Sequence, residues 1–351
     1  MALDLKPLRI GHITLDVPVV LAALAGYTDL PYRLICRRLG APYCASEMML
    51  DRLLMLPGRL KRRFVQLTDE DHPVAGQIAG NEPEVMAESA ALVCEAGFDV
   101  VDLNFACPVR KVIARKRGGW VHREPELAAR IMRAVAARVD RPFTVKLRIA
   151  YDGPGVDDCF WRIAEAALEA GAAAICVHAR AVQQRYRGRA DWAALAQIKQ
   201  RFPDRTIIGS GDVANAAAAI NMIQQTGVDG ASFARGAIGN PWAFRQLRDA
   251  LAGRPLYKPP VAEQRAVLEG HFRHAVEIYG ENRGSRMMRK FGIKYARMHP
   301  RPGKLRVAFV AVKNQRQWLA VLEQWYADES GLPLATAAEP EIADNFDDFE
   351  E

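Results

Sequence analysis

The sequence lacks long hydrophobic runs, and no apolar stretch approaches the roughly 18 residues that a membrane-spanning helix needs. Its first segment, MALDLKPLRIGHITLDVP, carries scattered charges and has no apolar centre of the kind found in secretory signals. We therefore expect a soluble, cytoplasmic protein without a membrane partner. Since 50% of the 351 residues are hydrophobic, the chain can bury a large core.

Cysteines are few and are not spaced for metal binding or cross-linking. No two of the six cysteines form a C-x-x-C pair, and only Cys176 lies within a few residues of a histidine, His178. Zinc sites and disulfide frameworks both depend on regular spacing. We expect free thiols, no structural metal, and a monomer.

Charge of one sign is missing from two segments near the C-terminus. Residues 339–351, EPEIADNFDDFEE, hold seven acids and no base, whereas residues 283–306 hold nine Lys or Arg and no acid. The net charge of +7 becomes +14 without those seven acids, and so basic a body indicates a polyanionic partner. We expect residues 336–351 to form a solvated, disordered tail.

No G-x-G-x-x-G element follows the first predicted strand, which argues against a doubly wound open sheet, the alternative fold. Short apolar or β-branched runs instead alternate with helical patterns, as in parallel βαβ units. The eight runs are VVLAAL from Val19, YCASEM from Tyr43, PVAGQIA from Pro73, DVVDLN from Asp99, FTVKLRI from Phe143, AAICVH from Ala173, RTIIGS from Arg205 and DGASFA from Asp229. They predict a closed (β/α)8 barrel, a TIM barrel, with LRIGHITLDVP as a hairpin at its bottom.

Polar residues or glycines follow all eight predicted strands. In chain order they are Gly26; Glu47; Gln77; Asn104 and Cys107; Lys146 and Arg148; His178 and Arg180; Gly211 and Asp212; and Arg235 and Gly236. Singly, Gln77 could bond to the backbone, Lys146 could be a surface cation and His178 could be a core residue. Because TIM barrels carry their chemistry at the carboxyl ends of the strands, the complete set predicts an active site.

The segments GSGDV and ARGAIGNPW, after the seventh and eighth strands, are glycine-rich turns that each lead into a helix. Ordinary tight turns would have a similar composition. Freed backbone amides and helix N-termini bind phosphate, however, and TIM barrels commonly bind one after these two strands. We expect a phosphate near Gly211, Asp212, Arg235 and Gly236, with a charge-assisted contact from Arg235.

Seven segments, in order, resemble the tRNA-dihydrouridine synthases, and the bacterial B-type members are most similar. They are ALAGYTDLPYRLICRRLGA with SEMM, GQIAGNEPEVMAESAALVCEAGFDVVDLNFACPVRKV, VKLRI, VHARAVQQRYRGRADW, IGSGDV, DGASFARGAIGNPWAF and RMMRKFGIKYAR, which together span roughly residues 18–300. The resemblance implies a TIM barrel with bound FMN that reduces uridine in tRNA, with NADPH as the reductant. No separate dinucleotide motif is visible, so both reductions are expected to use one pocket in turn.

The resemblance also implies roles for single residues. The positions that match FMN contacts are Gln77, Lys146, His178, Gly211, Ala234 and Arg235, the last three around the phosphate. Asn104 and Cys107 match the substrate side, where the cysteine protonates C5 of uracil, and Arg180 matches an arginine on that side.

Four positions depart from the family pattern. Ala23 and Leu24, at the flavin, stand where Pro-Met is common, Ser210 replaces an asparagine, and Ala106 replaces a glycine before the cysteine. These departures affect details of flavin contact and leave the implied reaction unchanged.

A thiol suits the role of proton donor independently of the resemblance. Reduction of the C5–C6 double bond needs a hydride at C6, which a flavin supplies, and a proton at C5. A free cysteine has a pKa of about 8.5 and keeps its proton at pH 7, where a carboxylic acid has lost it. Cys107 could instead be a buried apolar residue, but Pro108 and the charges after it indicate that the chain has left the core. We expect Cys107 to be catalytic.

The run RKVIARKR, residues 110–117, places five bases in eight positions just after Cys107. A solvated helix face is the ordinary explanation of such a run. A strand-end thiol beside positive charge nevertheless suits a nucleotide within a polyanion, because phosphates would be drawn towards the pocket. Arg110 and Lys111 are the predicted contacts with the substrate.

A second basic region lies in residues 283–306. Four bases, here called the basic stripe, fall at helical spacing beside the apolar residues Met287, Phe291, Tyr295 and Met298. The basic stripe consists of Arg286, Lys290, Lys294 and Arg297. We expect the apolar residues to pack and the basic stripe to bind tRNA.

The β pattern stops at about residue 246 and helical patterning follows. We therefore expect a catalytic, FMN-binding barrel over residues 1–245 and a smaller all-helical, tRNA-binding domain over residues 246–335. A base stacked in folded RNA cannot reach a flavin, so the target uridine must be extruded into the pocket.

Two other functions remain open at this point. An FMN barrel reductase of a small pyrimidine, or of another unsaturated small molecule, would share the flavin and the cysteine but would not need the basic helical domain. A noncatalytic RNA-binding protein would account for the charge but not for eight polar strand ends.

Overall fold

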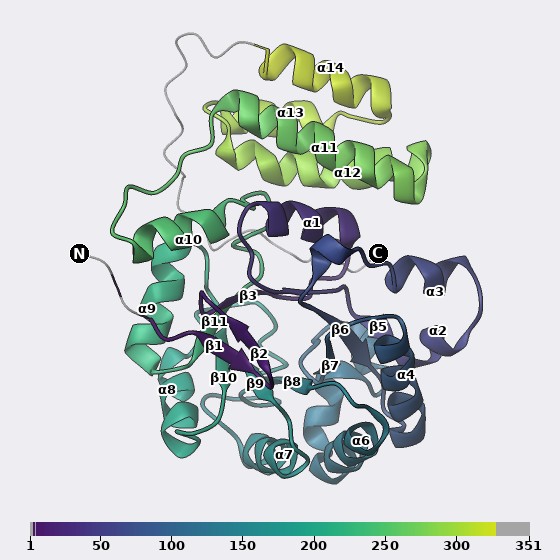
Figure 1. Ribbon diagram of the computed structural model, residues 1–351, viewed down its shortest axis with the longest axis vertical. Helices are drawn as coiled ribbons and strands as arrows, with labels where there is room; N and C mark the ends of the chain where they lie inside the picture. The colour runs from purple at the N-terminus through teal and green to yellow at the C-terminus, as the bar shows by residue number, and fades with distance from the viewer. Residues whose placement is uncertain (1–2, 4, 328–351) are drawn as a thin grey trace.

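The computed structural model describes residue 3 and residues 5–327. Eight parallel strands form its centre (Figure 1). Around the ring they are β3 (Val19–Leu21), β4 (Cys44–Ala45), β6 (Val74–Ala79), β7 (Val100–Asn104), β8 (Phe143–Arg148), β9 (Ala174–His178), β10 (Ile207–Ser210) and β11 (Gly230–Phe233). Because β11 pairs with β3 and β4 pairs with β6, the ring is closed. The predicted TIM barrel and all eight predicted strands are confirmed.

Helices between the strands surround the barrel (Figure 1). They are α1 (Leu30–Arg38), α2 (Asp51–Met55), α3 (Arg59–Phe64), α4 (Pro83–Glu95), α5 (Arg110–Ile113), α6 (Pro125–Arg138), α7 (Asp158–Glu169), α8 (Trp192–Arg201), α9 (Ala216–Thr226) and α10 (Ala243–Leu251), with 3₁₀ turns η1 (Asp69–Asp71) and η2 (Gly118–Arg123). A short strand that the sequence did not predict, β5 (Met49–Leu50), pairs with β6.

The core has an inner and an outer part. Side chains that point outward from the strands pack against the helices in one large cluster. The inner cluster lies inside the barrel, where Leu8, Ile10 and Leu15 contact residues such as Val100 and Ala174. Those three belong to the antiparallel hairpin of β1 (Leu8–Ile10) and β2 (Ile13–Leu15). The hairpin expected at the bottom of the barrel is therefore present.

The register of the strands brings polar residues together inside the upper half of the barrel. Gln77 on β6 lies beside Asp102 on β7, and Asp102 lies beside Thr144 on β8. One step further along, Asn104 lies beside Lys146. Since side chains alternate between the two faces of a strand, these residues point to the same side, the interior of the barrel.

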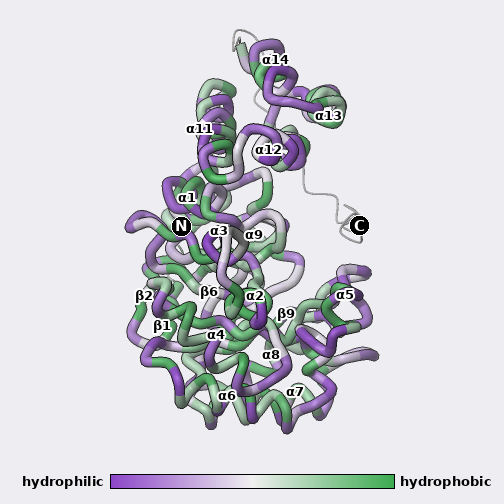
Figure 2. Tube along the Cα trace, turned by 90° about the vertical axis from the view of Figure 1, so that its right-hand side faces the viewer, coloured by the Kyte–Doolittle hydropathy of each residue, from purple (hydrophilic) through white to green (hydrophobic). Residues whose placement is uncertain are grey.

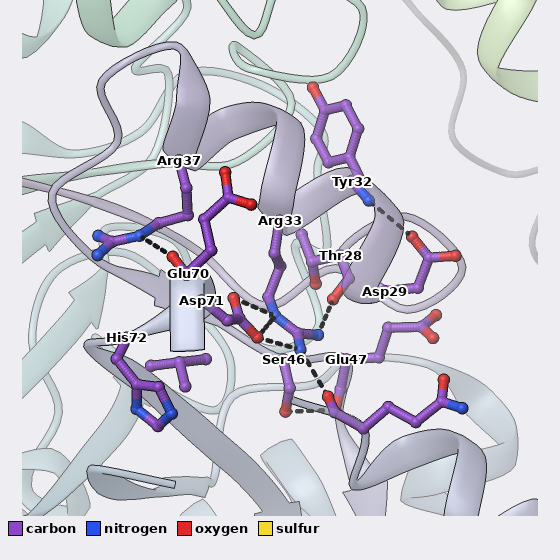
Figure 3. Close-up of polar contacts among 12 residues, drawn as sticks. Thr28, Asp29, Tyr32, Arg33, Arg37, Ser46, Glu47, Glu70, Asp71 and His72 are labelled. Atoms are coloured by element: carbon purple, nitrogen blue, oxygen red, sulfur yellow. Dashed lines mark hydrogen bonds and ion pairs between the residues drawn. The ribbon is translucent and has the colours of Figure 1, made fainter. Parts of the chain in front are cut away.

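A buried ion pair fastens α1 to the segment before β6 (Figure 3). The guanidinium of Arg33 donates to both carboxylate oxygens of Asp71, with Nη2 at 2.6 Å. It also donates to the carbonyls of Thr28 and Gln66. Both charged side chains are almost completely buried. The segments before α1 and after α3 are thereby held against the first helix of the barrel.

Four helices lie beside the barrel, above α1 and α10 in Figure 1. They are α11 (Val261–Tyr279), α12 (Glu281–Tyr295), α13 (Pro302–Val310) and α14 (Gln315–Trp325), with the 3₁₀ turn η3 (Ala296–Met298) after α12. The predicted helical region is confirmed. The predicted domain boundary at residue 245 falls within α10, and the division into two domains stays a prediction. The acidic segment, residues 336–351, lies outside the described residues, as do residues 328–335 of the predicted helical domain.

Helix α12 buries a broader face than one apolar stripe. Phe291, Tyr295 and Met298 are buried as predicted, but Met288 is fully buried whereas Met287 is half-buried. The reason is that α12 packs against α11, α13 and α14 at once. Among the described residues, no helix is long and apolar enough to cross a membrane.

Candidate functional site

A chain of hydrogen bonds links the barrel interior to the loop that carries Cys107. Asp102 accepts from Gln77 Nε2 at 2.6 Å, and Gln77 Oε1 accepts from Asn104 Nδ2 at 2.7 Å. Asn104 Oδ1 in turn accepts the backbone N–H groups of Ala106 and Cys107, at 3.0 and 2.9 Å. The structure therefore joins the predicted residues Gln77, Asn104 and Cys107 in one hydrogen-bond chain that begins at the carboxylate of Asp102.

Cys107 lies just beyond the end of β7 with a half-buried residue surface. Burial raises the pKa of its thiol, and the nearby charge of Arg148 only partly offsets this effect. A raised pKa keeps the thiol protonated at neutral pH. The local environment thus favours a proton donor over a nucleophilic thiolate.

Lys146 and His178 lie on neighbouring strands at the same mouth of the barrel. The ammonium of Lys146 donates to Cys176 Sγ at 3.3 Å. Burial, followed by the charges of Arg148 and Lys146, lowers the pKa of His178 well below its usual range. His178 is therefore a neutral imidazole at pH 7, able to donate from one nitrogen and accept at the other.

The two glycine-rich turns lie against each other, as the phosphate prediction requires. A Cβ on Gly236 would come within 2.3 Å of the carbonyl of Val213, so only glycine allows this contact. Gly211 has φ +118°, a conformation that L side chains rarely adopt. Asp212, which directly follows Gly211, also has a positive φ, 57°.

Asp212 joins the predicted arginines of this region. Its carboxylate accepts from Arg180 Nη2 at 2.5 Å and from the backbone N–H of Ala190, and Arg235 Nη2 lies 3.8 Å away. Arg180 also donates to the carbonyl of Gly188 and is completely buried. Its Nε is buried without a hydrogen-bond partner among the described residues.

The remaining predicted cofactor residues lie around the same mouth. Ala23 and Leu24 follow β3 and are half-buried, Ser210 ends β10 beside His178, and Ala234 follows β11. Below them a cavity of about 40 Å³ inside the barrel is lined by polar side chains as well as apolar ones. The polar lining residues are Gln77, Asp102, Thr144, Lys146, Cys176 and Ser232.

These residues fit a phosphorylated flavin. The glycine turns and the arginines beside Asp212 provide donors for an anion, and the barrel mouth provides Gln77, Lys146 and a neutral His178 for a polar ring edge. The assignment of single residues to FMN stays a prediction.

The basic run after Cys107 is exposed at its start and buried at its last member. Arg110 and Lys111, on α5, are exposed. Arg117 is buried and forms an ion pair with Asp51 at 2.8 Å, which ties the end of the run to α2. In Figure 2, α5 projects from the right-hand side of the barrel, the side on which α13 also lies.

The basic stripe on α12 is exposed at its start and covered at its end. Arg286 is exposed, whereas Lys290, Lys294 and Arg297 are half-buried. The ammonium of Lys290 donates to the carbonyl of Gly26, and Arg297 Nη2 donates to the carbonyl of Gly236 at 2.7 Å. Lys290 and Arg297 therefore bond to loops at the mouth of the barrel, and the contact of the basic stripe with tRNA stays a prediction.

Sequence reasoning missed Asp102 and Tyr186. Asp102 left a signal, since it is the only acid inside the apolar run VVDLN. Tyr186 left none, because it lies in a polar loop. In the structure its ring lies 5.5 Å from the guanidinium carbons of both Arg148 and Arg235.

Comparison with known proteins agrees with this geometry. A model of the dihydrouridine synthase (Dus) family matches residues 20–330. The tRNA-dihydrouridine synthase B of Xanthomonas campestris pv. campestris is 34% identical to the chain over 333 residues, 93% of this chain and 98% of that protein. The chain belongs to the dihydrouridine synthase family. The tRNA-dihydrouridine synthase B of Pseudomonas aeruginosa is also 34% identical, over 94% of this chain and 99% of that protein.

The predicted family and its B-type similarity are thus confirmed. A solved structure of 2-naphthoyl-CoA reductase with 2-naphthoyl-CoA resembles this dihydrouridine synthase with a TM-score of 0.56 and 14% identity. The match covers 71% of this chain and 52% of that one. At this identity the likeness shows the shared fold alone.

Proposed function

We propose that this dihydrouridine synthase reduces the C5–C6 double bond of a uridine in tRNA, with FMN as cofactor and NADPH as reductant. The observation that carries the proposal is the Cys107 thiol, kept protonated by burial and fixed by Asn104 at the mouth of the barrel. The relatives with 34% identity are named for this reaction.

Bound FMN would supply a hydride to C6 of the uracil. Cys107 then donates the proton of its Sγ to C5, and its raised pKa means that this proton is present at neutral pH. Gln77, Lys146 and His178 would contact the flavin ring, with Ala23, Leu24 and Ser210 beside it. Gly211, Asp212, Ala234, Arg235 and Gly236 would surround its phosphate. Asn104 and Arg180 would face the substrate side.

The substrate proposal rests on the distribution of charge. Arg110 and Lys111 on α5 follow directly from the Cys107 loop and are exposed. Helices α11–α14 form the proposed tRNA-binding domain, and α12 carries Arg286 at the exposed end of the basic stripe. A small-molecule reductase would not need either surface.

The test is to map dihydrouridine in RNA from cells with and without the protein, and then to assay the purified enzyme on tRNA and on free uridine. We expect loss of dihydrouridine at defined tRNA positions, a yellow protein that releases FMN on heating, and no activity on free uridine. Unchanged dihydrouridine would refute the proposal, and equal activity on free uridine would favour the small-molecule alternative. Released FAD would refute the cofactor assignment.

A further inference from the structure

The carboxylate of Asp102 begins the hydrogen-bond chain that ends at the Cys107 loop, and the proposed reaction leaves it without a role. One oxygen accepts from the hydroxyl of Thr144 at 2.7 Å and the other from Gln77 Nε2 at 2.6 Å. Gln77, Asp102 and Asn104 are all buried, with exposed fractions of 1%, 8% and 6%. Water is therefore a poor substitute for any member of the chain.

The chain has a fixed direction. The N–H groups of Ala106 and Cys107 can only donate, so they require the oxygen of the Asn104 amide. That choice turns the Asn104 amide nitrogen towards Gln77, which must present its oxygen there and its own nitrogen at the far end. A side chain that accepts at position 102 is then needed to complete the chain, and an ionised carboxylate accepts without donating.

The strand register holds the first links in place. The Cα of Asp102 pairs with that of Gln77 on one side and with that of Thr144 on the other. All three side chains therefore meet inside the barrel without reaching across it. Only the last link, from Asn104 to the backbone at positions 106 and 107, leaves the sheet.

We propose that Asp102 is a positioning residue of the reaction: through Gln77 and Asn104 it fixes the backbone of the Cys107 loop and so the place of the donating thiol. The inference rests on the proposed function for its chemical meaning. The orientation itself is a property of the protein without tRNA and can be measured separately.

The first test compares Asp102→Leu, Asp102→Asn and a matched control, Asp99→Leu. Asp99 precedes β7 and bonds to His72 and to the N–H of Val74, away from the Cys107 loop. The readouts are the rate at which iodoacetamide alkylates Cys107, followed by peptide mass spectrometry, and hydrogen exchange of the amides at positions 106 and 107. A hydrogen bond to a charged group stabilises the closed loop, so its loss should raise the population of the open Cys107 loop about tenfold.

We expect Asp102→Leu to raise both rates about tenfold. Asp102→Asn should stay within about twofold of the parent, because an amide can accept from Gln77 with its oxygen and donate to Thr144 with its nitrogen. Asp99→Leu should also leave both rates unchanged. Unchanged rates in Asp102→Leu, or an equal rise in Asp99→Leu, would overturn the proposal.

A second pair of variants covers the case in which Asp102→Leu does not fold. Gln77→Glu places two carboxylates face to face and should expose the Cys107 loop. Adding Asp102→Asn supplies a donor to that new carboxylate, whose other oxygen still accepts from Asn104, so the double variant should return to the parental alkylation rate. Failure of the second substitution to restore it would also overturn the proposal.

Neither test depends on tRNA or on turnover. An enzyme that makes no dihydrouridine but shows the expected alkylation pattern would refute the proposed function and leave the role of Asp102 as orienting group standing. The reverse result would refute only the role of Asp102.

Discussion

Cys107 is the residue on which the proposed chemistry depends most directly. If its thiol protonates C5, Cys107→Ala should lower tRNA reduction by about 10²-fold or more, the scale of general acid catalysis. Bleaching of the bound flavin by NADPH should persist, because that step needs no proton donor towards the uracil. Single-turnover assays that follow flavin absorbance and dihydrouridine separately would distinguish the two steps.

Cys94→Ala is the matched control, since this thiol is half-buried on α4, outside the site. It should behave like the parent in both assays. Full tRNA activity in Cys107→Ala would remove the cysteine from the mechanism.

What the sequence revealed about single residues depended on their backbone position. Gln77, Asn104 and Lys146 could be predicted because each lies near the end of an apolar run, and strand ends meet at one mouth of a barrel. The connection through Asp102 could not, because it depends on the register between β6 and β7, which the composition of the two strands does not reveal. Tyr186 could not either, since nothing in a polar loop shows which ring will meet two arginines.

At the scale of elements, the buried pair of Arg33 and Asp71 joins α1 to the segment before β6 (Figure 3). Arg33→Met should lower the free energy of unfolding by about 3–5 kcal/mol, because it leaves the Asp71 carboxylate buried and unpaired. Arg38 lies on the same helix as Arg33 and forms an exposed pair with Glu70, so Arg38→Met should cost at most about 1 kcal/mol. Chemical denaturation measures both, and equal losses would show that Arg33 contributes no more than a surface pair.

Helix α11 contains a buried imidazole that makes its packing sensitive to acid. His271 is fully buried against Tyr32, Phe291 and Tyr295, and burial lowers its pKa to about 3 from an ordinary 6.5. Below pH 6.5 His271 is protonated in the unfolded chain but stays neutral in the folded chain, so the free energy of unfolding falls as the pH falls. Between pH 7.5 and 5.0 the loss from this group is about 2 kcal/mol.

His271→Leu should therefore flatten the decline in stability from pH 7.5 to pH 5.0. His12→Leu, at an exposed position in the turn between β1 and β2, serves as the control and should keep the parental slope. Melting temperatures at several pH values would decide, and parallel curves for all three proteins would contradict the prediction.

Helices and strands were predictable where the hydrophobic pattern of a segment and its length both indicated the same element. The barrel strands carry near-continuous apolar runs because their two faces contact the inner and outer parts of the core. β5 has two residues, Met49 and Leu50, which is too short for any period to appear. The buried face of α12 was predicted too narrowly. A single apolar stripe is typical of a helix that packs against one neighbour, whereas α12 packs against three other helices.

At the scale of the whole molecule, exposed arginines at the start of α12 are the expected contacts with RNA. Arg283, Arg286 and Arg289 are exposed, and within the described part of the chain none of them has a hydrogen bond to the barrel like those of Lys290 and Arg297. Changing all three to Gln should flatten the dependence of log affinity on log salt by about 0.7–0.9 for each phosphate that is no longer neutralised. Reduction of the flavin by NADPH should not change.

Arg130→Gln with Arg133→Gln provides the control, because these bases lie on α6, on the side of the barrel opposite α11–α14 (Figure 1). Salt titrations of tRNA binding should leave that variant with the parental slope. A parental slope in the α12 variant as well would assign the grip on tRNA chiefly to the run from Arg110 to Arg117.

The whole-molecule arrangement was the least predictable level. A net charge of +14 outside the acidic segment indicated a polyanionic partner, and the end of the β pattern indicated a helical region. Neither observation says where the helices attach. The position of these helices on the barrel depends on contacts such as that of Lys290 with Gly26, two residues that are 264 positions apart in the sequence.

Lys290 and Arg297 donate hydrogen bonds to backbone carbonyls of two barrel loops. Lys290 bonds to the loop that begins with Ala23 and Leu24, and Arg297 bonds to the loop of Arg235 and Gly236. The proposed grip on RNA and the proposed flavin loops therefore share one rigid connection. Thermodynamic linkage then demands reciprocity: whatever factor bound tRNA adds to the affinity for FMN, FMN must add to the affinity for tRNA. We expect FMN to dissociate more slowly from the tRNA complex, and the effect to vanish when Lys290 and Arg297 are both changed to Met. The dissociation rate of FMN would in that case indicate whether tRNA is bound to the enzyme.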